Sequence, residues 1–268
     1  MDDALEIAKR AALAGGAVLH DRRENMGAIS SKSSTTDFVT EADVASGVAV
    51  VSAILESDPN ARILVEEDEV YGLVGVEKAT LGEGDVWVID PLDGTTSYIH
   101  GYPTYSVSVA LVRGTRPVAG AVYNAAANEM NAAAEGCGAT RDGVRIHVSN
   151  AARIQDSLVI TGFPYDHGDP LTRQLAVLAA FLRAPVHGMR RDGSAAVDLC
   201  HVAGRRADGF WEFALKPWDM AAGVVIAREA GALVTDIEGR DWSTECDSAL
   251  AANPVLHALM LELITRVR

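Results

Sequence analysis

One short stretch constrains this chain more than any other. An apolar run starts at Val86 and leads into two closely spaced carboxylates, Asp90 and Asp93. Pro91 cannot donate a hydrogen bond to a sheet ladder, so a strand is predicted to stop at Asp90. Gly94 then predicts a turn that opens a helix with free backbone N–H groups at its start. This arrangement favours a site where divalent cations bind the acids and a phosphate binds both cations and amides.

The alternative is that this stretch is only a hairpin turn followed by a helix cap. Against it, acids recur at the ends of other predicted elements: Glu66 and Glu67 after the apolar run 63–65, Asp219 before an apolar helix, and Asp37 and Asp43 at the start of a helix that ends near residue 56. Four acidic element ends in one chain favour a common metal site over four unrelated caps.

These segments resemble the signatures of the inositol monophosphatase family. Residues 90–95 match its first signature and residues 218–223 its second, while Glu66, Glu67 and the segment 37–43 occur in the family's chain order. The resemblance covers nearly the whole chain. It implies an α/β fold layered as helix, sheet, helix, sheet and helix, and a Mg²⁺-dependent, Li⁺-sensitive phosphoric monoester hydrolase.

The resemblance also implies roles for individual residues. Two or three Mg²⁺ ions would be bound by four carboxylates and one main-chain carbonyl, those of Glu66, Asp90, Asp93, Asp219 and Leu92 respectively. Three catalytic residues would position and activate the attacking water: Thr95, Asp43 and Glu67. The substrate would contact Lys32, Asp93, Gly94, Thr95, Gly193, Ser194, Ala195, Glu212 and Asp219. A helix cap is the structural alternative for Thr95, and a solvent-facing carboxylate is the alternative for Glu212.

The overall charge narrows the class of partner. The formal net charge is −14, which argues against direct binding to nucleic acid or to anionic membranes. Bound cations would reverse this field locally and allow an anionic phosphate ester to bind. The acidic N-terminus lacks the pattern of a secretory signal, and three cysteines without a C-x-x-C pair favour free thiols in a reducing cytoplasm. A homodimer is expected from the resemblance.

The pattern along the chain predicts one catalytic domain, residues 1–268, with an α+β half at about 1–151 and an α/β half at about 152–268. An antiparallel meander is predicted from residue 106, and residues 68–85 read as a surface loop. Helices are predicted at 4–23, 43–56, 171–181, 195–203, 219–230 and 254–267. This alternation indicates a layered α/β fold.

The substrate is less constrained than the chemistry. Inositol 1-phosphate is the leading candidate, and histidinol phosphate is the alternative, because Glu212 and Asp219 suit an ammonium as well as a diol. Fructose 1,6-bisphosphate and adenosine 3′,5′-bisphosphate each need a basic subsite, for which only Lys216, Arg190 and Arg191 qualify. A non-enzymatic alternative is a regulatory protein on the same fold that binds the transcription machinery.

Overall fold

The structure is a computed structural model that describes residues 2–25, 27–31, 38–164 and 168–267. Lys32 and Asp37 therefore lie outside the described residues. The helices are α1 (Asp2–Asp21), α2 (Glu41–Leu55), α3 (Glu69–Val74), α4 (Thr95–His100), α5 (Asp169–Arg183), α6 (Ala195–Ala203), α7 (Pro217–Glu229) and α8 (Pro254–Thr265), with a 3₁₀ turn η1 at Ile154–Asp156.

The strands fall into three sheets. A two-stranded ribbon pairs β1 (Ile29–Ser31) with β2 (Phe38–Thr40). The seven-stranded sheet has the order of the sequence: β3 (Ile63–Val65), β4 (Asp85–Asp93), β5 (Ser106–Arg113), β6 (Arg116–Asn124), β7 (Glu129–Ala134), β8 (Gly138–Arg141) and β9 (Val144–Arg145). The five-stranded sheet has the order β11 (Gly188–Arg190), β10 (Leu158–Thr161), β12 (Gly209–Phe213), β14 (Ser248–Ala252) and β13 (Leu233–Thr235).

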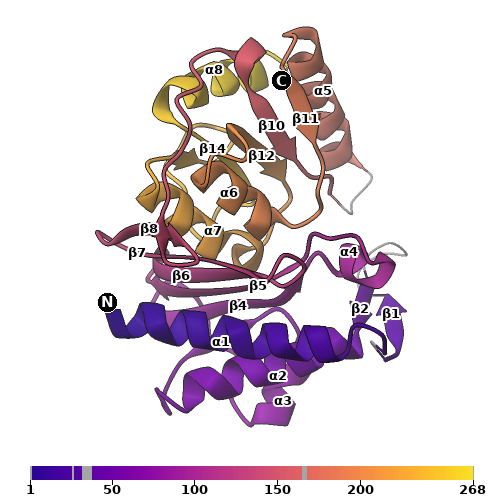
Figure 1. Ribbon diagram of the computed structural model, residues 1–268, viewed down its shortest axis with the longest axis vertical. Helices are drawn as coiled ribbons and strands as arrows, with labels where there is room; N and C mark the ends of the chain where they lie inside the picture. Colours follow the sequence, from indigo (N-terminus) through magenta and orange to yellow (C-terminus); the bar gives the residue numbers. More distant parts are fainter. Residues whose placement is uncertain (1, 26, 32–37, 165–167, 268) are drawn as a thin grey trace.

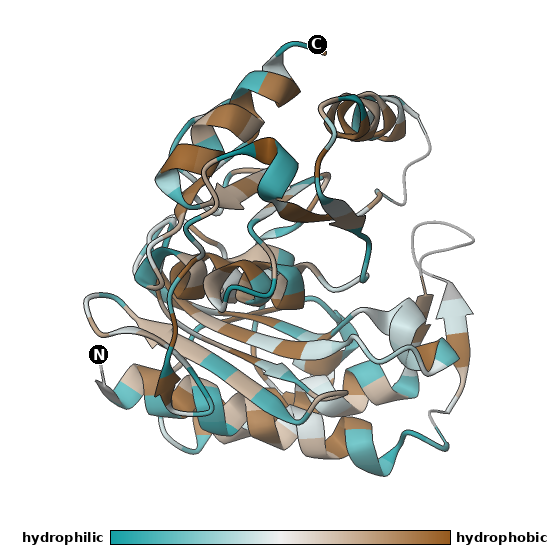
Figure 2. Cartoon of the chain, turned by 45° about the horizontal axis from the view of Figure 1, so that its top comes forward, coloured by the Kyte–Doolittle hydropathy of each residue, from teal (hydrophilic) through white to brown (hydrophobic). Residues whose placement is uncertain are grey.

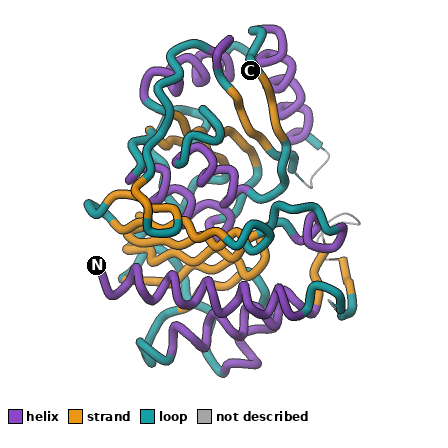
Figure 3. The backbone as a smooth tube through the Cα atoms, in the orientation of Figure 1, coloured by secondary structure: helices purple, strands orange, loops and turns teal. Residues whose placement is uncertain are grey.

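These elements stack in five alternating layers, as the family resemblance implies (Figure 1). Helices α1 and α2 cover one face of the seven-stranded sheet, and α6 and α7 separate that sheet from the five-stranded one. Helices α5 and α8 cover the far face of the five-stranded sheet. The tube in Figure 3 shows the two large sheets in orange with helices between and outside them, and the small β1–β2 ribbon as a third orange body at the right. The fold is thus a layered α/β sandwich.

The middle layer explains why α7 is apolar on every side. Residues 220–227 are all buried, which fits a helix that lies between two sheets rather than at a surface. In Figure 2, by contrast, the outer helix α1 alternates between hydrophilic and hydrophobic residues. The position of α7 matters for the site, because its first turn carries Asp219 to the interface between the two sheets.

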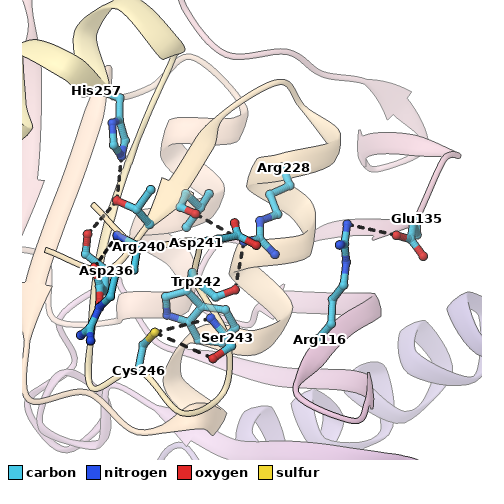
Figure 4. Close-up of polar contacts among 12 residues, drawn as sticks. Arg116, Glu135, Arg228, Asp236, Arg240, Asp241, Trp242, Ser243, Cys246 and His257 are labelled. Atoms are coloured by element: carbon cyan, nitrogen blue, oxygen red, sulfur yellow. Dashed lines mark hydrogen bonds and ion pairs between the residues drawn. The ribbon is translucent and has the colours of Figure 1, made fainter. Parts of the chain in front are cut away.

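The segment between β13 and β14 is fixed by polar contacts (Figure 4). Arg228 on α7 donates to the Oδ1 of Asp241 at 2.6 Å and to the carbonyl of Trp242 at 3.0 Å. Asp236 accepts from the Nε of Arg240 at 2.6 Å. These contacts hold a long connection with little regular structure against α7. Strand β14, which follows this connection, pairs antiparallel with β12.

Three local predictions are wrong. Strand β4 does not stop at Asp90 but continues through Pro91 to Asp93. The pairing shifts between Asp90 and Asp93, and a bulge is where a residue without an N–H is tolerated. The predicted loop 68–85 contains the short helix α3, which buries Val70. Strands β11 and β14 were not predicted, because both are short and lack the alternating pattern of a half-buried strand.

Candidate active site

The site begins where two parallel strands end side by side. Strand β3 pairs in parallel with β4, so Glu66, which follows β3, comes next to the acidic end of β4. The backbone N–H of Glu66 donates to the carbonyl of Ile89 at 3.1 Å, which fixes this alignment. Two segments more than twenty residues apart thus deliver carboxylates to one point.

The bulge in β4 shapes the pair of acids. The backbone N–H of Leu92 donates to the Oδ1 of Asp90 at 3.0 Å, so the Asp90 side chain folds over its own bulge. On the other side of the bulge, the hydroxyl of Ser46 on α2 donates to the carbonyl of Pro91 at 2.8 Å. Asp90 is only 2% exposed. The extra residue allows Asp90, Leu92 and Asp93 to face one cavity although they share one strand.

Asp93 is fixed by the start of helix α6. Its Oδ2 accepts from the hydroxyl of Ser194 at 2.6 Å and from the backbone N–H of Ala196 at 2.8 Å. Burial raises the pKa of Asp93 to about 6, while these hydrogen bonds act in the opposite direction and the charge of Glu66 adds to the rise. A bound cation would remove the penalty for the ionised form.

Asp219 reaches the same place from the first turn of α7. Its Oδ2 accepts from the backbone N–H of Lys216 at 2.7 Å, a capping contact that fixes the side chain. Burial raises the pKa of Asp219 well above its usual range, and the charges of Glu66 and Asp93 raise it further. All three acids line one cavity, where like charges disfavour the ionised form of each.

A threonine–aspartate pair lies beside the acids. The Oγ1 of Thr95 lies 3.1 Å from the Oδ1 of Asp43 and 3.1 Å from the carbonyl oxygen of Leu92. Asp43 is held in turn by Thr40, whose backbone N–H and hydroxyl donate to its Oδ2 at 2.9 and 2.5 Å. Thr95 has one proton for two acceptors. If another group occupies the Leu92 carbonyl, the Thr95 hydroxyl donates its hydrogen bond to Asp43. The Thr95 oxygen can then accept a hydrogen bond from a third group.

Gly94 allows the turn that joins these parts. Its φ is 93°, in the left-handed region that favours glycine. A Cβ there would also lie 3.0 Å from the backbone oxygens of both Thr104 and Gly193. The requirement for glycine therefore has two sources, the backbone conformation and the close approach of the segment that precedes α6.

The acids open into a single cavity of about 630 Å³, including its mouth. Of the residues predicted as metal ligands or substrate contacts, those that line it are Glu66, Asp90, Leu92, Asp93, Gly94, Thr95, Gly193, Ala195, Glu212 and Asp219. Three predicted residues are buried and do not line the cavity: Asp43, Glu67 and Ser194. Ser194 therefore contacts Asp93 rather than the open cavity, and it also caps α6 by accepting from the N–H of Val197 at 3.3 Å.

The far end of the cavity contains a buried acid on the five-stranded sheet. Glu212 in β12 is 8% exposed and packs so closely on Gly162 that a Cβ at that position would lie 2.0 Å from its Oε1. Burial raises the pKa of Glu212 to about 8, the charge of Asp93 adds to this, and Arg191 opposes it. The alternative of a solvent-facing Glu212 is wrong.

Several lining residues were not predicted as part of the site: Phe38, Gly162, Phe163, Arg191 and Leu215. Of these, only Arg191 could have been singled out from the sequence, since it belongs to an unusually charged segment before Gly193. The others are ordinary apolar or small residues whose role depends on the packing of distant segments.

The donor set fits divalent magnesium. Four carboxylates and one main-chain carbonyl converge on the cavity, and oxygen ligands of this kind are the ones that Mg²⁺ prefers. Burial raises the pKa values of Asp93 and Asp219, and a bound cation would favour the ionised form of both carboxylates. Glu66, Asp90, Asp93, Asp219 and the carbonyl of Leu92 are the groups that could hold the cations.

The fold and the site define an α/β sandwich whose cavity is rich in carboxylate oxygens and lies beside a buried Thr–Asp pair. The model of the inositol monophosphatase family matches residues 1–268. The chain is 39% identical over 266 residues to a Neisseria meningitidis serogroup B protein named Putative Nus factor SuhB, which covers 99% of both chains. It is 38% identical over 263 residues to a Fructose-1,6-bisphosphatase/inositol-1-monophosphatase of Aquifex aeolicus, covering 97% of this chain and 94% of the relative.

The solved structures agree with the sequence comparisons. The inositol monophosphatase of Anabaena (Nostoc) sp. PCC 7120 superposes with a TM-score of 0.84 at 35% identity, covering 100% of this chain and 97% of that one. The chain belongs to the inositol monophosphatase family. Within the described part of the chain, no helix combines the length and apolar character that a membrane crossing requires.

Proposed function

We propose that the chain is a Mg²⁺-dependent phosphomonoesterase that hydrolyses a small phosphorylated alcohol, with inositol 1-phosphate as the leading substrate. One observation carries the proposal: Glu66, the Asp90–Asp93 bulge and Asp219, far apart in sequence, line one cavity together with Thr95. Two or three Mg²⁺ ions bound there would activate a water, polarise the phosphate and stabilise the leaving oxygen.

The residues of the chain supply positioning. Asp43 is oriented by Thr40 and accepts the hydrogen bond of the Thr95 hydroxyl, so that the Thr95 oxygen can accept a hydrogen bond from the attacking water. Glu67, which is buried and adjoins Glu66 in the sequence, is proposed to contribute to the same water. The backbone N–H groups of Gly94 and Thr95 are proposed to contact the phosphate. Direct attack by water needs no covalent intermediate.

The opposite end of the cavity is proposed to bind the alcohol. Glu212 would accept hydrogen bonds from hydroxyl groups, and Gly193 and Ala195 would contact the carbon skeleton. Lys32 remains a proposed contact from outside the described residues. The chain is further proposed to be a cytoplasmic homodimer. It is also proposed to bind neither nucleic acid nor anionic membranes, which the net charge of −14 supports.

Three other substrates follow from particular residues. Glu212 and Asp219 on the cavity wall would also suit the ammonium of histidinol phosphate. Arg191 on the same wall would suit the second phosphate of fructose 1,6-bisphosphate or adenosine 3′,5′-bisphosphate. The combined name of the Aquifex relative supports testing the sugar bisphosphate.

A substrate panel tests the proposal. Purified protein is assayed for phosphate release from these four esters with Mg²⁺, with chelator, and with Mg²⁺ plus Li⁺. We expect Mg²⁺-dependent turnover, the highest kcat/KM on inositol 1-phosphate, and inhibition by submillimolar to millimolar Li⁺. Metal-independent turnover, or none on any ester, would contradict the proposal. A lack of turnover would favour the regulatory alternative that the name of the Neisseria relative suggests.

A further inference from the structure

A second group of possible metal ligands lies on helix α6, outside the catalytic cavity. Asp198 and His201 are three residues apart on the helix and therefore share a face. Asp192 lies just before the Ser194 cap of the same helix. One ligand atom from each of the three residues lies within 4.8 Å of the other two. None of the three lines the catalytic cavity as the described residues define it.

Asp198 is the unusual member of the group. It is 1% exposed, and both of its carboxylate oxygens are buried without a hydrogen-bond partner among the described residues. A buried carboxylate that is neither paired nor hydrogen-bonded is strongly disfavoured. Burial raises the pKa of Asp198 well above its usual range, and the charges of Glu212, Asp192 and Asp93 raise it further. A positive charge at this position would relieve the penalty.

The other two residues give a cation a route to Asp198. Asp192 and His201 are partly exposed, whereas Asp198 lies at the buried end of the group. Burial lowers the pKa of His201 from its ordinary value, so its imidazole is neutral near pH 7, which is the form that ligates metals. An acid and a histidine three positions apart on a helix are a recurring ligand pair in metal sites of helical proteins.

We propose that Asp192, Asp198 and His201 form a site for a divalent transition metal such as Zn²⁺, Mn²⁺ or Co²⁺. The imidazole ligand distinguishes this site from the all-oxygen catalytic cavity, because nitrogen ligands suit transition metals, whereas Mg²⁺ prefers oxygen. The metal would tie Asp192 to α6. Since Asp192 adjoins Gly193, it would also fix the turn that forms part of the cavity wall.

Another explanation needs no metal. A protonated Asp198 could donate a hydrogen bond to Asp192, with the carboxylates sharing one proton. The two explanations differ in the part played by His201, which the metal site requires and the proton-sharing pair does not.

The test uses full-length protein, stripped of metal and then saturated with Mg²⁺ to occupy the catalytic cavity. Co²⁺ is added, and binding is followed by calorimetry and by the visible absorption of the bound ion. We expect one saturable Co²⁺ per chain in the wild type, and at least tenfold weaker binding in His201→Gln and in Asp192→Asn. His187→Gln is the matched control, because His187 is exposed and outside the group.

Two further measurements complete the test. The Asp90→Asn variant should retain the Co²⁺ site, which separates it from the catalytic cavity and from the proposed phosphatase activity. In metal-free protein, Asp198→Asn should raise the melting temperature, and in Mg²⁺-saturated protein it should abolish the further rise that Co²⁺ gives the wild type. Equal Co²⁺ binding by the wild type and both His201→Gln and Asp192→Asn would overturn the proposal, as would the absence of a saturable site in Mg²⁺-saturated wild type.

Discussion

The two ends of the cavity are built differently. At the end proposed for phosphate, backbone or hydroxyl donors hold the acids in place: Ser194 and Ala196 hold Asp93, and the N–H of Lys216 holds Asp219. At the end proposed for the alcohol, Glu212 accepts no hydrogen bond within the described residues and is placed by close packing on Gly162. The geometry needed for phosphate chemistry is fixed in advance, whereas the acid that would select the alcohol keeps its hydrogen-bonding capacity for a ligand.

This contrast separates two properties of the proposed enzyme. Metal-assisted hydrolysis tolerates little displacement of its ligands, so preorganised acids are expected where the bond is broken. Substrate selection depends on which groups remain unpaired when the wrong ligand binds. Substitutions at the two ends should therefore affect different kinetic constants.

The largest effect is expected at the phosphate end. Asp90→Asn should fold like the wild type and lose about 4 kcal/mol or more of transition-state stabilisation, roughly a thousandfold in kcat, because it removes a charge proposed to bridge two cations. The measurement is kcat at saturating Mg²⁺. Asp68→Asn, which alters an exposed carboxylate paired with Lys78, is the control and should keep near wild-type activity. If Asp90→Asn kept the wild-type kcat, the assignment of phosphate chemistry to this end of the cavity would be contradicted.

A smaller and more selective effect is expected at the alcohol end. Glu212→Gln should reduce kcat/KM for the preferred substrate about ten- to hundredfold, which corresponds to roughly 1.5–3 kcal/mol for one charge-assisted hydrogen bond. Hydrolysis of a generic aryl phosphate should change much less. Glu245→Gln on an exposed turn is the matched control. Equal losses on both substrates would show that Glu212 supports the metal site or the fold instead.

The smallest effect concerns stability. Glu212 has an ordinary pKa near 4.5 and a folded-state pKa of about 8, so between these values the folded state binds a proton that the unfolded state has released. The contribution to stability is complete below pH 4.5 and is lost as the pH rises through 8. Metal-free protein should therefore melt several degrees lower at pH 8.5 than near pH 5. Glu212→Gln should flatten this dependence.

Titration of Asp93 also lowers the stability of the folded protein as the pH rises. It does so at lower pH than Glu212, since burial raises the pKa of Asp93 from 3.8 to about 6. Saturating Mg²⁺ should raise the melting temperature most at high pH, where the carboxylates are ionised and ready to bind it. An identical pH dependence in the wild type and in Glu212→Gln would show that Glu212 is not the group that titrates.

The sequence was most informative where chemistry is encoded in adjacent residues. The acids after β3 and in β4, Gly94 and the acid that opens α7 could be identified from short motifs, and the alternating elements predicted the layered fold. The bulge at Pro91 was not predicted, because proline excludes a regular ladder but does not reveal that the strand continues beyond it. Arg191 and Gly162 join the cavity wall only through packing between segments that are distant in sequence.

The sequence by itself determined which residues are candidates for the chemistry, because oxygen ligands, a hydroxyl and a glycine turn are properties of residue type and local order. Only the tertiary structure decided their partners. It placed Ser194 behind Asp93, packed Glu212 on Gly162, and left Asp198 buried beside Asp192 and His201. These relations depend on how α6 lies between the two sheets, and such packing is set by contacts between distant parts of the chain that no local pattern encodes.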